Sequence, residues 1–114
     1  MPTQVLLIGN EKERRRIYIQ SILYIQIDDY LSTFYLSNNQ KFICSKPLNE
    51  ISNYLPYHFF QINRECIVNL NEILSVRRRN RKIIISNSIE LVVSTRRAKD
   101  FNEALASQSI TFAR

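Results

Sequence analysis

Short runs of β-branched and aromatic residues, separated by polar breaks, make up most of the chain. Residues 17–20 and 22–27 are two such runs, and the acidic pair at 28–29 follows them. They are too short for amphipathic helices and are typical of strands. A further apolar run at 5–8 is followed by a mixed charge run at 11–16, which we interpret as a solvated face or the end of a lead-in strand.

Two stretches predict hairpin turns built without glycine. Residues 30–36 and 41–45 predict a hairpin across 37–40, and residues 86–88 predict a turn before the apolar run at 89–93. The chain has a single glycine. Asparagine is expected in its place, because it is the next residue to tolerate the left-handed backbone that tight turns need.

Two segments have apolar residues at helical spacing. The first is 46–55, and the second runs from Arg96 to about Ala106, with Ser94 and Thr95 as its expected N-cap. The apolar positions are Leu48, Ile51, Tyr54 and Leu55 in the first helix and Ala98, Phe101, Ala104 and Leu105 in the second. The whole pattern predicts one mainly antiparallel β domain with two short helices.

The stretch from Phe59 to Leu70 places polar residues between two apolar runs. We interpret it as a core strand that is interrupted to present Asn63 and Arg64 at the surface. The apolar runs at 73–76 and 83–86 flank a strongly basic segment in the same way, which predicts a β-hairpin with a basic tip.

Positive charge is concentrated in this half of the chain. The 114 residues carry a net charge of +6, and residues 60–99 hold nine bases against three acids. Those bases are Arg64, Arg77, Arg78, Arg79, Arg81, Lys82, Arg96, Arg97 and Lys99. A basic excess confined to one segment indicates a polyanionic partner.

The sequence lacks the residue patterns that other function classes need. One glycine excludes a glycine-rich phosphate loop. Cys44, His58 and Cys66 do not have the spacing of a zinc site. We therefore expect no enzyme, metal or cofactor. Two cysteines without a leader sequence indicate reduced thiols in the cytoplasm, and no apolar run is long enough for a membrane span.

Three partners remain open from the residues alone. Arginine reads guanine edges and clamps phosphates, which favours duplex DNA. The six Tyr and six Phe residues would suit stacking on RNA or single strands if several were exposed on one sheet face. A basic surface could also bind an acidic protein, or the strand edges could pair with a partner strand.

The segment Phe59 to Ile73 resembles the signature of the LytTR DNA-binding domain. That signature reads Phe, any residue, Ile, His, Arg, Ser, an apolar pair and Val-Asn-Leu, ending in Ile. Here Ile62, Arg64 and the run 68–70 match it, whereas Asn63 stands at the His position and Glu65 at the Ser position. The blocks at 22–25, 48–51 and 93–96 also resemble parts of this family.

The resemblance implies an elongated fold of small antiparallel sheets that inserts loops into successive major grooves and bends DNA. Such domains serve bacterial transcription regulators. By motif position, Arg64 and Arg96 are expected to contact bases, with Tyr30 as a third contact in the loop after the early strands. Asn63 is expected to hydrogen-bond base or phosphate. The expected backbone contacts are Ser94, Arg97 and Lys99 from the helix start and Arg77, Arg78, Arg79, Arg81 and Lys82 from the basic hairpin.

We divide the chain into a lead-in at 1–14, a LytTR-like domain at 15–106 and a loose tail at 107–114. A receiver domain, which often precedes such a domain, does not fit in this length. The chain is expected to be a stand-alone regulator or an isolated domain that binds direct-repeat duplex sites. A homodimer on DNA is one expected arrangement. An upstream partner protein is one expected source of control.

Overall fold

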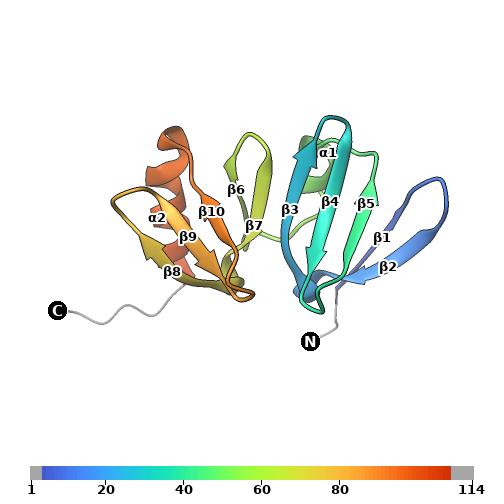
Figure 1. The fold of residues 1–114 in the computed structure, drawn as a ribbon, viewed down its shortest axis with the longest axis horizontal. Coiled ribbons are helices and arrows are strands. Elements are labelled where there is room, and N and C mark those ends of the chain that lie inside the picture. Colours follow the sequence, from blue (N-terminus) through green and yellow to red (C-terminus); the bar gives the residue numbers. More distant parts are fainter. Residues whose placement is uncertain (1–3, 109–114) are drawn as a thin grey trace.

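The structure is a computed structural model that describes residues 4–108. Within these residues, ten strands form three antiparallel sheets, and two α-helices accompany them (Figure 1). The molecule is elongated, with extents of 51 × 35 × 25 Å. The prediction of a mainly β fold with two short helices is confirmed. No helix in this range is long and apolar enough to cross a membrane.

The central sheet has five strands in the order β5-β4-β3-β7-β6. Its strands are β3 (Ile22–Asp28), β4 (Leu31–Leu36), β5 (Lys41–Cys44), β6 (Phe59–Asn63) and β7 (Cys66–Asn69). The predicted hairpin across 37–40 joins β4 to β5, as expected. Asn39 takes a positive φ of 65° there, so asparagine replaces glycine as proposed.

Both faces of the central sheet are covered, which explains why β3 and β7 are nearly continuous apolar runs. Successive side chains of a strand point to opposite faces. Ile25 and Ile67 therefore belong to one core with the helix α1 (Leu48–Ser52), whereas Tyr24 and Val68 belong to a second core.

The hairpin of β1 (Val5–Gly9) and β2 (Arg14–Tyr18) adds to the first core. Leu6, Ile8 and Ile17 are buried there. The charge run after Gly9 is thus partly a turn and partly a strand, in which Arg14 pairs with Gly9.

The second core is closed by a three-stranded sheet and the helix α2 (Ala98–Ser107). The strands are β8 (Ile73–Arg77), β9 (Lys82–Ile85) and β10 (Glu90–Val92), in the order β10-β9-β8. The Phe101 ring meets the Phe60 ring edge-on, with centroids 5.9 Å apart, and so fixes α2 against β6. Of the predicted loose tail, Ser107 still belongs to α2, and residues 109–114 lie outside the described residues.

The start of the second helix differs from the prediction. Thr95–Arg97 form a 3-10 turn (η3), and the α-helix begins only at Ala98. Ser94 occupies the N-cap position of the 3-10 turn, but its side chain makes no capping hydrogen bond. The two arginines therefore precede the α-helix, and the first turn of α2 contains Asp100, whose charge the helix dipole favours.

Candidate nucleic-acid interface

The central motif forms a tight hairpin rather than one interrupted strand. β6 ends at Asn63, β7 begins at Cys66, and these two residues pair directly across the turn. Arg64 and Glu65 are the two exposed turn residues. The prediction of a single interrupted strand is wrong because two strands, each paired along its length, lie on either side of these residues.

The side chain of Asn63 holds this turn in place. Its Oδ1 accepts a hydrogen bond from the backbone N–H of Glu65 at 2.9 Å, and its Nδ2 donates to the carbonyl of Val92 at 2.9 Å. Both ends of the amide are therefore used within the protein. A histidine at this position would not offer the same pair of groups in the same geometry.

Backbone bonds fix the turn on both of its sides. The N–H of Ile27 donates to the carbonyl of Glu65 at 2.8 Å, and the N–H of Ser94 donates to the carbonyl of Ile62 at 2.9 Å. The first bond joins the turn to β3, and the second joins β6 to the segment before η3. The Arg64 side chain thus projects from a backbone with little freedom to move.

Tyr30 lies in the turn between β3 and β4, at the same end of the sheet as Arg64. The preceding Asp29 has a positive φ of 56°, and the Tyr30 side chain is 88% exposed. Figure 1 shows the β3–β4 and β6–β7 turns side by side along the upper edge. The β3–β7 pairing requires this, since Gln26 opposes Cys66.

The segment from β10 to α2 carries the next bases. Arg96 and Arg97 are both exposed, and Arg97 donates from Nη1 to the carbonyl of Gln61 at 3.2 Å. The amide of Gln61 lies 3.4 Å from the carbonyl of Arg64. Gln61 therefore connects the two basic turns, a role that the sequence alone did not indicate although the residue lies inside the signature.

The β8–β9 hairpin carries Arg78 to Arg81 in its turn. Arg77, Arg78 and Arg79 are exposed, whereas Arg81 is half-buried and has a positive φ of 54°. Its Nε donates to the carbonyl of Val93 at 3.0 Å, and the N–H of Val93 donates back to its carbonyl at 2.9 Å. This two-way contact ties the basic hairpin to the η3 segment.

Within residues 4–108, the ion pairs are Arg15–Glu13, Lys46–Glu50 and Lys82–Glu90. Arg64 and Arg96 thus have no carboxylate partner in the described part of the chain. Lys82 differs, because its Nζ lies 3.4 Å from a Glu90 oxygen. Exposed pairs of this kind contribute little to stability and exchange readily for another anion.

Cys66 lies directly behind the Arg64 turn and is closed off from solvent. It is 3% exposed, and burial raises the pKa of its thiol to about 12. Burial also raises the pKa of Cys44, and both cysteines are free. A thiol that stays protonated at neutral pH reacts slowly, which argues against oxidant sensing by the folded chain.

A small groove lies between the Arg64 turn and β10. It has a volume of about 460 Å³ and is lined by Gln26, Asn63, Arg64, Glu65, Cys66, Glu90, Leu91, Val92 and Ser94. Two glutamates lie beside the arginine, so this groove is not itself a basic pocket.

In the described residues, no three His, Cys, Asp or Glu side chains gather in a way that could hold a metal ion.

The family comparison decides what this arrangement is. A family model described as the LytTr DNA-binding domain matches residues 12–106. The chain belongs to the LytTR DNA-binding domain family. This confirms the resemblance carried by the central motif, and it identifies the chain as a DNA-binding domain.

A solved LytTR structure shares the fold. It is the LytTr DNA-binding domain of a putative methyl-accepting/DNA response regulator from Bacillus cereus. The TM-score is 0.78 at 18% sequence identity, and the alignment covers 93% of this chain and 99% of the other. No curated protein matches the chain.

Proposed function

We propose that this LytTR domain binds specific duplex DNA sequences, with Arg64 and Arg96 reading bases. The observation that carries this is the Arg64 turn, which is fixed by Asn63 and two backbone bonds while the guanidinium has no carboxylate partner in residues 4–108. Base discrimination needs a donor pair held in a defined orientation. A fixed turn with a free arginine meets that need.

The dimensions support contact with more than one groove. Successive major grooves on one side of B-DNA are about 34 Å apart. The long axis of the molecule measures 51 Å, and the β3–β4 turn, the β6–β7 turn and the start of α2 lie on one side of it (Figure 1). Arg64 and Tyr30 can then enter one major groove, while Arg96, on its own segment, contacts a different part of the DNA.

The other predicted residues divide into two roles. We assign the exposed bases of the β8–β9 hairpin, together with Ser94, Arg97 and Lys99, to phosphate contacts, which need charge but no fixed geometry. Arg97 uses one N–H donor for the bond to the Gln61 carbonyl, and its other donors are available for phosphate. Asn63 is better explained as a positioning residue than as a contact, because both ends of its amide are already bonded.

An RNA or single-strand function has weaker support. The most exposed tyrosines are Tyr30 and Tyr57, at 88% and 85%, and both lie in turns or loops rather than on a sheet face. Phe34 and Phe101 are buried in the two cores. The stacked pair Tyr24 and Tyr35 on β3 and β4 is buried or half-buried, so the described sheets present no platform of adjacent exposed rings.

The test is a selection of bound duplexes from a random pool, followed by anisotropy titration of the selected site. We expect a common sequence, tighter binding to it than to its scrambled duplex, and no displacement by single strands at equal salt. Recovery of unrelated sequences, or displacement by single strands, would reject sequence-specific duplex binding. Titrations of duplexes with one or two copies of the selected site test whether two copies of the domain bind a direct repeat.

A further inference from the structure

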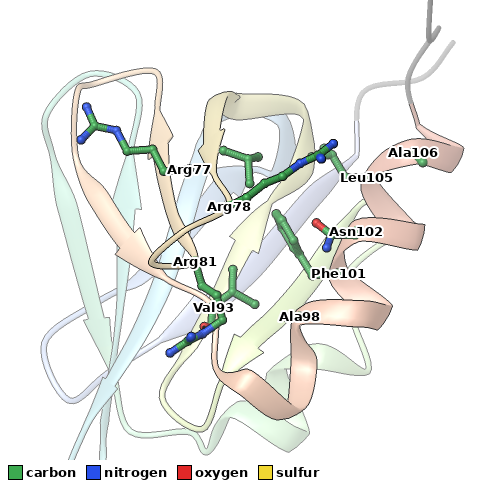
Figure 2. A pocket seen from close by; sticks show the side chains of 10 residues that line it. Arg77, Arg78, Arg81, Val93, Ala98, Phe101, Asn102, Leu105 and Ala106 are labelled. Atoms are coloured by element: carbon green, nitrogen blue, oxygen red, sulfur yellow. The ribbon is translucent and has the colours of Figure 1, made fainter. Parts of the chain in front are cut away.

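A second groove lies between α2 and the β8–β9 hairpin, away from the Arg64 turn. Its volume is about 600 Å³, within the range of small-ligand sites. We call it the α2 groove (Figure 2). It is lined by Val76, Arg77, Arg78, Arg81, Val93, Ala98, Phe101, Asn102, Leu105 and Ala106.

The floor of the α2 groove is apolar and is held by the second core. Phe101 and Val93 are only 1% and 2% exposed, so they form a fixed base. Ala98 and Ala106 line the helix side, where longer side chains would fill the space. A flat ring or a short acyl chain fits such a surface, because burying apolar area there is favourable.

The rim of the groove is positively charged. In Figure 2 the Arg78 side chain extends from the hairpin toward α2, whereas Arg77 points away from the helix. Arg81 is anchored at the other end by its bond to the Val93 carbonyl. No acidic residue lines the groove, and the ion pairs of residues 4–108 involve none of its arginines. The charge of the rim is therefore available to a ligand.

We infer that the α2 groove binds an amphipathic organic anion. Its carboxylate or sulfonate group would accept hydrogen bonds from Arg78, and its aromatic or short acyl body would lie over Phe101 and the two alanines. A volume of about 600 Å³ favours a small molecule over a long protein segment. Occupancy would also weaken duplex binding, a part that rests on the proposed function, because Arg78 could then no longer contact phosphate.

Two fluorescent probes with the same rings test the site itself. They are 1-anilinonaphthalene-8-sulfonate, which carries the anion, and N-phenyl-1-naphthylamine, which lacks it. We expect the anionic probe to bind about tenfold more tightly, since a hydrogen bond to a charged group contributes at least that much. Equal affinity would overturn the inference, because it would show binding to any exposed apolar surface.

Matched variants locate the bound probe. Arg78→Ala is expected to remove the tenfold preference for the anionic probe, and Arg79→Ala, on the same turn but outside the groove, is expected to retain it. Asn102→Trp should block the groove and weaken both probes, whereas Glu103→Trp, at the next exposed position of α2, should not. If the two arginine variants, or the two tryptophan variants, changed probe binding equally, the probe would bind elsewhere and the proposed site would be wrong.

Duplex titrations with saturating anionic probe test the coupling separately. Occupying Arg78 should lower the slope of log affinity against log salt by about 0.9, the value for one phosphate contact. An unchanged slope with the probe bound would overturn the coupling but leave the proposed DNA function standing. A peptide of alternating Glu and Leu that displaced the probe at lower concentration would assign the groove to a protein partner instead and reject the small-molecule ligand.

Discussion

The β6–β7 and β8–β9 turns both present arginine between antiparallel strands, yet they are built differently. The β6–β7 turn has two exposed residues and is held by the Asn63 amide and by the bond from Ile27. The β8–β9 turn has four residues, of which only Arg81 is tied to a neighbouring segment. Arg78 and Arg79 are both exposed.

This difference separates recognition of base edges from contact with the phosphate backbone. We call the β6–β7 turn the reading turn. Base edges are distinguished by paired donors at fixed positions, so a base-reading arginine needs a backbone that does not move. Phosphates attract any nearby cation, and their contacts carry no sequence information. The β6–β7 turn, which is held by side-chain and backbone bonds, is therefore suited to specificity, and the exposed arginines of the β8–β9 turn are suited to affinity.

The largest expected effect comes from removing the positive charges that contact phosphates at the β8–β9 hairpin. Replacing Arg77, Arg78 and Arg79 together with alanine should flatten the salt slope by about 2.7 and weaken binding about a hundredfold near physiological salt. The loss should be equal for preferred and random duplexes in anisotropy titrations. A loss confined to the preferred site would mean that this turn also reads bases.

A smaller effect is expected from loosening the reading turn. Asn63→Ala removes two hydrogen bonds, which should cost about 1–2 kcal/mol of unfolding free energy and about tenfold in preference for the selected site. The matched control is Asn38→Ala, which removes a similar bond to Gln40 at the opposite end of the sheet. It should leave the preference unchanged. If both variants reduced preference equally, the local role of Asn63 would be disproved.

The smallest effect concerns the thiol behind the reading turn. The pKa of Cys66 is about 12 in the folded chain, above its ordinary value, so unfolding releases a proton at high pH. The full stability is present below about pH 8, and urea titrations should show a loss of roughly 1 kcal/mol by pH 9.5. Tyr24, whose pKa burial also raises to about 12, contributes at higher pH. Rapid native alkylation of Cys66 at pH 8 would instead show that the turn opens.

Much of the fold could be predicted from the sequence because its signals are local. The β-branched and aromatic runs indicated the strands, and the spacing of Leu48 and Ile51 indicated α1. The second helix was placed two residues too early at its start, because the sequence does not show that Thr95–Arg97 form a 3-10 turn. The Ser94 cap also failed for this reason.

The candidate site was less predictable because its contacts join distant segments. The motif singled out Asn63 and Arg64, but the bond from Asn63 to Val92 spans 29 residues and leaves no local pattern. The same holds for Gln61 and Arg97, which are 36 residues apart. Sequence reasoning therefore found the exposed bases and missed the contacts that hold them in position.

One ratio tests most directly whether base recognition and phosphate contact belong to different turns. It is the affinity for the selected duplex divided by the affinity for the scrambled duplex, measured at one salt concentration. Arg64→Ala should lower this ratio tenfold or more while changing the affinity for scrambled duplex little. Arg79→Ala should weaken both duplexes equally and leave the ratio intact. An unchanged ratio for Arg64→Ala, with equal losses on both duplexes, would contradict base reading by Arg64.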